Sequence, residues 1–283
     1  MTIHPVSRQS AFWLNGTPTA VLPLPNRAVE FGDGLFETLL LHRGEALFSN
    51  LHLERLALGL RALALPDCLA TVQQHLDNVT RSIDKAPLWA ALRLSVIRGA
   101  GKRGYAPEEN AEPAILITVT QIERDCTRLS RAATMGVADI RLATQPLLAR
   151  IKHLNRLEQV LAAAQAQAEN VDECFVLDQD GRVVSLIAGN VFLVIKGELL
   201  TPALVNCGVA GTRRRLITEK WAPAIGLEVR ETQVTLSDLQ VADEVFYSNS
   251  LHGVRPISRL DAHAWDDHGV CAALFQQYLD DLA

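Results

Sequence analysis

The chain has 283 residues, 48% of them hydrophobic, so it is long and apolar enough to bury the cores of two domains. Its net charge is −5 with no block of like charges, which argues against a nucleic-acid or membrane-surface partner. No apolar run reaches the roughly 18 residues of a membrane-spanning helix, and the first residues lack the cationic and apolar segments of a signal peptide. The five scattered cysteines form no CxxC pair, which argues against a metal site or a disulfide framework and predicts a protein of the reducing cytoplasm.

The first half of the chain predicts a mixture of helices and strands. The expected elements are, in chain order, a strand before the turn at Asn15-Gly16, a strand over 35–41, a helix capped by Asn50, a helix over 69–83, and strands over 90–98 and 114–121. The polar, aperiodic stretch 123–131 follows. We place the domain boundary at its start, with one domain at 1–122 and the other at 123–283.

The second half predicts a sheet-rich domain with one prominent helix over 155–169. Asn155 and Glu158 suggest a capping box for that helix, and its apolar residues share one face. The other expected elements are strands over 139–143, 173–178, 182–187, 191–195, 198–201 and 244–248, and a helix that begins after Gly211-Thr212. The chain as a whole therefore predicts an α+β fold.

Lys152 is the lysine whose surroundings suggest chemistry. The apolar stretch 147–151 precedes it and the predicted helix follows it. A lysine that is partly removed from water has a lowered pKa, and its amine is then available for imine formation. The alternative is a lysine that extends its charge into solvent from a half-buried loop.

Five separate motifs resemble the class IV aminotransferase family, in the order in which that family has them. They are Phe31-Gly32-Asp33-Gly34 with Arg27 before it, His52-Leu53-Glu54-Arg55-Leu56, Ile151 to Glu158 around Lys152, Gly208 to Arg213, and Ser248-Asn249-Ser250. Each motif is weak alone, since Arg55 could be a surface ion pair and Gly211-Thr212 a plain turn. Their common order over nearly the whole chain carries the resemblance.

The resemblance implies a smaller N-terminal α/β domain, a larger pseudo-barrel C-terminal domain, a homodimer, and pyridoxal 5'-phosphate (PLP) as the cofactor. It makes Lys152 the Schiff-base lysine. Residues that it assigns to the cofactor are Arg55, Lys152, Ser185, Asn190, Gly211, Thr212, Arg213 and Ser250. A helix N-terminus and an arginine are suitable donors for a phosphate dianion.

Within the family, the aminodeoxychorismate lyases are the most similar subgroup, because of Lys152 to Leu161, Arg103 to Pro107 and Asn249-Ser250-Leu251. This similarity implies conversion of 4-amino-4-deoxychorismate to 4-aminobenzoate and pyruvate, a step of folate synthesis, with Lys152 as the catalytic base. Arg103, Tyr105 and Asn249 are then candidates for binding the dicarboxylic substrate. A D-amino-acid or branched-chain aminotransferase and a weakly active or non-catalytic paralogue are the alternatives.

The sequence departs from the family pattern at Ser185. Five residues before the asparagine matched to Asn190, the family has a glutamate that pairs with the protonated pyridine nitrogen of PLP. Three interpretations remain open. The serine could bond a neutral pyridine, which suits elimination; the protein could have lost activity; or another acid, such as Glu173, could take the role.

Overall fold

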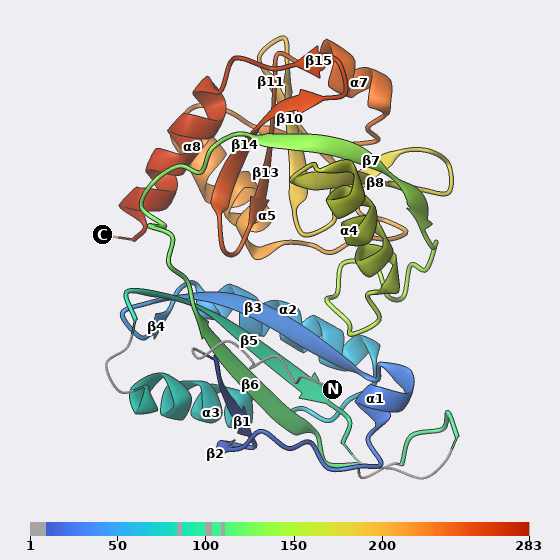
Figure 1. The fold of residues 1–283 in the computed structure, drawn as a ribbon, viewed down its shortest axis with the longest axis vertical. Helices are drawn as coiled ribbons and strands as arrows, with labels where there is room; N and C mark the ends of the chain where they lie inside the picture. Colours follow the sequence, from blue (N-terminus) through green and yellow to red (C-terminus); the bar gives the residue numbers. More distant parts are fainter. Residues whose placement is uncertain (1–9, 84–86, 100–103, 109–110, 283) are drawn as a thin grey trace. The chain divides into compact units, whose positions relative to one another are not determined.

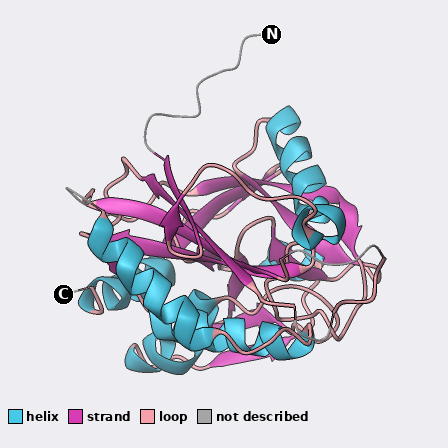
Figure 2. Cartoon of the chain, turned by 90° about the horizontal axis from the view of Figure 1, so that it is seen from below, coloured by secondary structure: helices cyan, strands magenta, loops and turns pink. Residues whose placement is uncertain are grey.

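The structure is a computed structural model that describes residues 10–83, 87–99, 104–108 and 111–282. The chain divides into two compact units, of which the first comprises Met1–Asp125 and Lys152–Asn155 and the second Cys126–Ile151 and Arg156–Ala283. Each unit combines a sheet with helices, which confirms the predicted α+β class (Figures 1 and 2). The segment Lys152–Asn155, which the sequence analysis assigned to the second domain, makes its contacts with the first unit.

The first unit is built on an antiparallel sheet with the strand order β2-β1-β6-β5-β3-β4. Its strands are β1 (Ser10–Leu14), β2 (Thr17–Pro18), β3 (Gly34–His42), β4 (Glu45–Ala46), β5 (Trp89–Ile97) and β6 (Ala114–Gln121). Its helices are α1 (Arg27–Phe31), α2 (Ser49–Ala62) and α3 (Leu69–Ser82). The strand predicted over 35–41 is therefore present as β3.

Strand β3 is buried along most of its length because most of its side chains on both faces are apolar. It pairs with β5 along its whole length, and α2 packs against it (Figure 1). A Cβ atom on Gly59 of α2 would lie 2.6 Å from the Leu35 side chain. The missing side chain at Gly59 therefore allows the close approach of α2 to β3.

The second unit is built on a mixed sheet with the strand order β12-β11-β10-β13-β14-β7-β8-β9, and β15 pairs with β14 beside this path. Its strands are β7 (Ala133–Leu142), β8 (Glu173–Asp178), β9 (Val183–Leu186), β10 (Asn190–Ile195), β11 (Glu198–Pro202), β12 (Val229–Thr232), β13 (Glu244–Asn249), β14 (Gly253–Leu260) and β15 (His263–Ala264). Its helices are α4 (Leu157–Glu169), α5 (Thr212–Leu216), η1 (Ile217–Trp221), α6 (Ala222–Ala224), α7 (Leu236–Val241) and α8 (Gly269–Asp280).

Helix α4 is the crossover that parallel pairing of β7 and β8 requires. It buries only the small side chains of Ala162 and Ala166. The apolar residues on its predicted face, in contrast, are exposed: Leu157 is 77%, Val160 58% and Leu161 57% accessible. Hydrophobic periodicity identified the helix correctly and does not distinguish a buried face from an exposed one.

Two predicted helix caps are wrong. Helix α2 begins at Ser49 after Phe48, which adopts the left-handed conformation, so Asn50 lies inside the helix. Helix α4 begins at Leu157 after Arg156. The Asn155 side chain donates instead to the carbonyl of Gly32, and Glu158 accepts from the backbone N–H of Ala143.

In the part of the chain that the structure describes, no helix has both the length and the apolar character needed to cross a membrane.

Candidate functional site

The segment around Lys152 lies along the edge of β3 in the first unit. Phe36 donates its backbone N–H to the Lys152 carbonyl at 2.9 Å, and Leu154 donates to the Gly34 carbonyl at 3.0 Å. The segment can pair there because β4 covers only the other end of β3, at Leu41 and His42. Lys152 is thus held by the backbone of a rigid strand.

The glycines of the Phe31-Gly32-Asp33-Gly34 motif make room for this segment. Gly32 has a φ of 64°, and a Cβ atom there would lie 2.5 Å from the Asn155 side-chain oxygen. A Cβ atom on Gly34 would lie 2.9 Å from the Leu154 side chain. Two motifs more than a hundred residues apart in the sequence are therefore in direct contact.

The Lys152 ammonium lies over an aromatic ring that also contacts a second cation. Its Nζ atom is 4.5 Å from the centre of the Phe36 ring, and the guanidinium carbon of Arg93 is 3.8 Å from the same centre. The two cations are thus no further apart than the sum of these distances. Sequence reasoning missed Phe36 and Arg93. Arg93 lies opposite Thr38 and reaches Phe36 diagonally, a contact that depends on strand register.

Arg55 belongs to a buried network with Glu37 of β3 and His52 of α2. Its Nε atom donates to Glu37 Oε1 at 2.8 Å, its Nη2 atom donates to Oε2, and His52 Nδ1 lies 2.6 Å from Oε2. Burial alone would raise the pKa of Glu37, but the Arg55 guanidinium and His52 hold it at about 2. The ionised carboxylate only accepts hydrogen bonds, so His52 Nδ1 carries the proton in this contact. The signal that marks Glu37 in the sequence is a charge inside an apolar strand.

The loop after β5 bears two of the predicted substrate residues. Arg103 lies outside the described residues. Tyr105 is 85% exposed, and its backbone carbonyl and that of Gly104 accept from Arg27 at 2.8 and 2.9 Å. Arg27 in turn is paired with Asp33 at 2.9 Å. The glycine motif and its preceding arginine therefore also anchor the backbone of this loop.

The second unit brings together four residues predicted to bind the cofactor phosphate. Gly211 is the N-cap of α5, which continues through η1 and α6. The hydroxyl oxygens of Thr212 and Ser250 lie 3.4 Å apart, and Arg213 Nη2 donates to the Ser250 carbonyl at 3.4 Å. The N–H groups of a first helical turn have no acceptor within the helix. With the two hydroxyls they form a donor set suited to a phosphate.

Asn190 holds the loop that leads into α5. Its side-chain nitrogen donates to the Val209 carbonyl at 2.9 Å, and its oxygen accepts from the Gly211 N–H at 3.0 Å. A Cβ atom on Gly211 would lie 2.1 Å from that oxygen, so the contact requires a glycine. The predicted residue Asn249 likewise binds backbone, since its oxygen accepts from the N–H groups of Leu251 and His252.

Ser185 and Glu173 lie on opposite faces of the sheet. Phe175 and Val176 of β8 pack into different core clusters, which distinguishes the two faces of that strand. Glu173 shares the face of Phe175, whereas the buried Ser185 of β9 is the direct partner of Val176. Glu173 therefore does not occupy the place of a carboxylate at position 185.

Glu173 has its own environment in the second unit. Burial raises its pKa to about 7, against the lowering effect of the backbone N–H groups of Ala188 and Ile187 and of the Arg255 guanidinium. Arg255 is also bonded to the Tyr247 hydroxyl at 3.1 Å.

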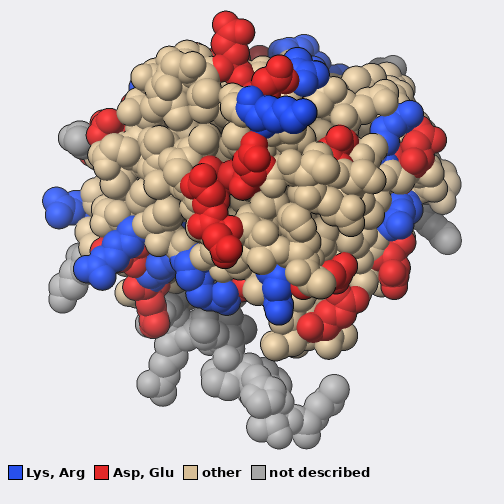
Figure 3. Space-filling model, turned by 90° about the horizontal axis from the view of Figure 1, so that it is seen from above, with Lys and Arg blue, Asp and Glu red and all other residues tan. Residues whose placement is uncertain are grey.

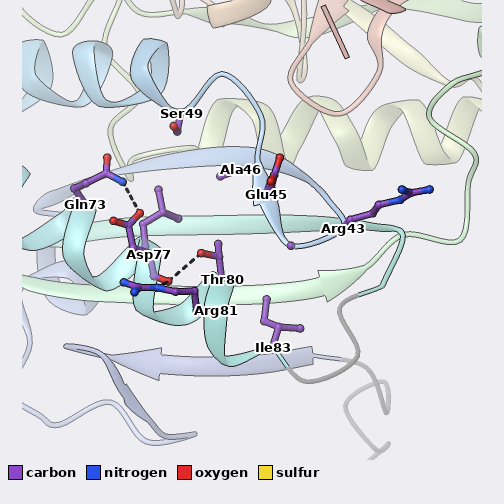
Figure 4. A pocket seen from close by; sticks show the side chains of 11 residues that line it. Arg43, Glu45, Ala46, Ser49, Gln73, Asp77, Thr80, Arg81 and Ile83 are labelled. Carbon is purple, nitrogen blue, oxygen red and sulfur yellow. Dashed lines mark hydrogen bonds between the residues drawn. The ribbon is translucent and has the colours of Figure 1, made fainter. Parts of the chain in front are cut away.

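A pocket of about 480 Å³ lies elsewhere in the first unit, between the β3–β4 turn and α3 (Figure 4). Gln73 Nε2 donates to Asp77 Oδ1 at 2.6 Å, and the Thr80 hydroxyl donates to the Asp77 carbonyl at 3.1 Å. None of the residues predicted for the functional site lines it. On the face of the molecule shown in Figure 3, basic and acidic side chains are interspersed, with wide uncharged areas between them.

Comparison with known proteins places the chain in a family. Residues 34–260 match the family model described as amino-transferase class IV. An aminodeoxychorismate lyase of Vibrio harveyi is 34% identical over 255 residues, which cover 89% of this chain and 92% of that protein. A D-alanine aminotransferase of Listeria innocua is 30% identical over 249 residues, which cover 86% of this chain and 83% of that protein.

A solved structure supports the same conclusion. The crystal structure of 4-amino-4-deoxychorismate lyase from Pseudomonas aeruginosa matches with a TM-score of 0.86 and 38% sequence identity, covering 96% of this chain and 99% of that chain. The predicted class IV aminotransferase-like fold is thereby confirmed. The chain belongs to the class IV amino-transferase family.

Proposed function

We propose that the protein is a cytoplasmic, PLP-dependent lyase that converts 4-amino-4-deoxychorismate to 4-aminobenzoate and pyruvate. The observation that carries the proposal is the placement of Lys152, whose segment is bonded to β3 and whose Nζ atom lies over Phe36. Similarity to two lyases at more than 30% identity over most of the chain supports the substrate.

The residues present fit PLP. In the second unit, the first N–H groups of α5 and the hydroxyls of Thr212 and Ser250 form a donor set that would suit its phosphate. The family resemblance assigns Arg55 to the same phosphate, and an arginine is a suitable donor for it. Asn190 would act through the backbone it holds at Val209 and Gly211. PLP, when bound, supplies an aldehyde that condenses with amines and a ring system that accepts electrons from an adjacent carbon.

In the proposed reaction Lys152 is the base. Its Nζ atom removes the proton from the substrate ring carbon that bears the amine. The electron pair of that C–H bond enters the ring, and the bond from the ring to the enolpyruvyl oxygen breaks. The ring becomes aromatic as 4-aminobenzoate. The bonding electrons leave with the oxygen as the enolate of pyruvate, which takes up a proton at its methylene carbon.

The substrate carries two carboxylates and needs cations to bind them. Arg93 is a candidate, because its guanidinium contacts the same Phe36 ring as Lys152. Arg103, Tyr105 and Asn249 remain candidates from the sequence. A bidentate arginine would orient the substrate as well as bind it.

An aminotransferase is the second candidate, favoured by the similarity to the D-alanine enzyme of Listeria innocua. Ser185 counts against it. A serine does not keep a pyridine nitrogen protonated, so electrons are less delocalised into the ring. A lyase, which expels its leaving group at once, depends less on that delocalisation. A weakly active or non-catalytic paralogue is the third reading of Ser185.

We also propose that the protein is a homodimer that uses α4. Leu157, Val160 and Leu161 form an exposed apolar stripe at helical spacing. Contiguous exposed apolar side chains of this kind are typical of protein–protein contacts.

The proposed function is tested by product analysis. Purified protein is incubated with 4-amino-4-deoxychorismate, and 4-aminobenzoate and pyruvate are quantified by chromatography. We expect equal amounts of the two products, and little amino transfer from D-alanine or a branched-chain amino acid to 2-oxoglutarate. Amino transfer that outpaces 4-aminobenzoate release would make the protein an aminotransferase, and no reaction with either substrate would favour the paralogue.

A further inference from the structure

Glu37 and His52 are buried polar residues that have no role in the proposed function so far. Both belong to the network around Arg55. Removing a carboxylate and a guanidinium from water is costly, and a buried ion pair is often no more stabilising than apolar packing. The network therefore indicates a role beyond holding α2 on β3.

The network fixes the orientation of the Arg55 side chain. Nε and Nη2 of Arg55 donate to different oxygens of the Glu37 carboxylate. Two bonds in the plane of the guanidinium determine its direction as well as its position. The carboxylate is restrained in turn by the proton on His52 Nδ1 at 2.6 Å.

Strand β3 relates Arg55 to Lys152. Glu37 binds Arg55, and its neighbour Phe36 contacts the Lys152 ammonium. Because β3 is paired with β5 over its whole length, these two side chains start from a rigid backbone. Adjacent residues of a strand point to opposite faces, so Glu37 and Phe36 place the two cations on the two faces of one rigid strand.

We infer that Glu37 and His52 are positioning residues that hold the Arg55 guanidinium in the orientation in which it binds the phosphate of PLP. The inference rests on the proposed function, in which Arg55 serves that phosphate. Glu37 and His52 act only through Arg55.

The test compares the binding of PLP with that of pyridoxal, which has the same ring and aldehyde without the phosphate. The dissociation constants of PLP and of pyridoxal are measured on the apoprotein. The dissociation constant of pyridoxal divided by that of PLP reports the contribution of the phosphate to binding. We expect Arg55→Ala to reduce this ratio roughly 10- to 100-fold, the range for lost bonds to a charged group. Glu37→Gln is expected to weaken the binding of PLP roughly tenfold and to leave the binding of pyridoxal unchanged. Glu45→Gln, the same change at an exposed site of this unit, is the control.

Two further comparisons separate positioning from general stability. Adding Glu37→Gln to the Arg55→Ala variant should not weaken PLP binding further, because Glu37 affects PLP only by orienting Arg55. His52→Asn can place an amide N–H where Nδ1 lies and should retain PLP affinity. His52→Leu offers no such donor and should weaken PLP binding as much as Glu37→Gln does. The His52 pair decides the matter if Glu37→Gln does not fold.

The inference would be overturned if Glu37→Gln or His52→Leu weakened the binding of PLP and of pyridoxal equally. It would also be overturned if the effects of the two substitutions in the double variant were additive. In either case the network would only stabilise the fold. An unchanged ratio in Arg55→Ala would instead overturn the phosphate role of Arg55 in the proposed function. The product assay tests the reaction itself independently of both.

Discussion

The Lys152 side chain lies against an aromatic ring, whereas that of Lys220 pairs with Asp281. The ammonium of Lys152 lies over the Phe36 ring, and its backbone is bonded to β3. The proposed reaction uses this one amine both to hold the cofactor and to remove the proton. We expect Lys152→Ala to lower 4-aminobenzoate formation by at least about 10³-fold and to abolish the absorbance of bound PLP near 410 nm. Lys196→Ala, in an exposed turn, should retain the activity and the absorbance of the native protein. If Lys152→Ala retained both instead, the chemistry would belong to another lysine.

Ser185 is the residue at which the chain departs from its family. If its hydroxyl meets a neutral pyridine nitrogen, Ser185→Glu should protonate the ring and strengthen it as an electron acceptor. The variant should then gain slow amino transfer, measured as pyruvate released from D-alanine in the presence of 2-oxoglutarate, while its lyase rate changes modestly. An inactive native protein that gains lyase activity with glutamate would show that Ser185 marks functional loss. No change in either activity would mean that residue 185 does not contact the ring.

Glu173 makes the stability of the protein dependent on pH. Its pKa is raised to about 7 in the folded protein, so its stabilising contribution is complete below about pH 4.5 and is lost as the pH rises through 7. Glu173→Gln cannot ionise and should therefore lose less stability between pH 5 and pH 8 than the native protein, by on the order of 2 kcal/mol. Urea unfolding at the two pH values measures this difference. Glu228→Gln, at an exposed site, is the control, and equal slopes in all three proteins would refute the prediction.

At the level of elements, the edge of β3 and the Lys152 segment form one structure. Backbone hydrogen bonds join them, and Gly32 and Gly34 provide the space for Asn155 and Leu154. The glycine motif therefore supports the segment of Lys152, the proposed catalytic residue, through packing. The network at Arg27 extends the same element to the Tyr105 loop.

Gly32→Ala tests this connection. The new Cβ atom would meet the Asn155 side chain at 2.5 Å, and alanine is strained at a φ of 64°. We expect a loss of about 2 kcal/mol in the free energy of unfolding and a large fall in turnover, because the Lys152 segment must shift. Gly181→Ala is a matched control: its φ is 79°, with nothing within 4 Å of the added atom. Equal effects of the two substitutions would show that only backbone strain matters at Gly32.

At the scale of the whole molecule, the exposed apolar residues of α4 are a feature of the described part of the chain that a single subunit leaves unexplained. Burial of a leucine side chain contributes about 1.5 to 3 kcal/mol, so three apolar residues repeated on two subunits would stabilise a dimer substantially.

Leu161→Arg should therefore shift the protein from dimer to monomer. A charged side chain cannot be buried at an apolar contact without a partner. Sedimentation velocity at micromolar concentration measures the change, and Gln276→Arg, on the exposed side of α8, should remain dimeric. A native protein that sediments as a monomer would overturn the homodimer, and a dimeric Leu161→Arg variant would place the contact elsewhere.

The sequence by itself determined the local features of this protein: the apolar strand β3, the helix α4, the glycine motif, and the position of Lys152 between an apolar stretch and a helix. These depend on residues close together in the chain, where hydrophobic periodicity and turn chemistry act. Only the tertiary structure decided that Lys152 pairs with β3, that Arg93 shares the Phe36 ring, that Glu37 holds Arg55, and that Glu173 and Ser185 face opposite ways. These relations follow from strand register and from contacts between segments far apart in the chain. A shift of one residue in register would reverse the face of every side chain, and no local pattern records which partner a strand edge accepts.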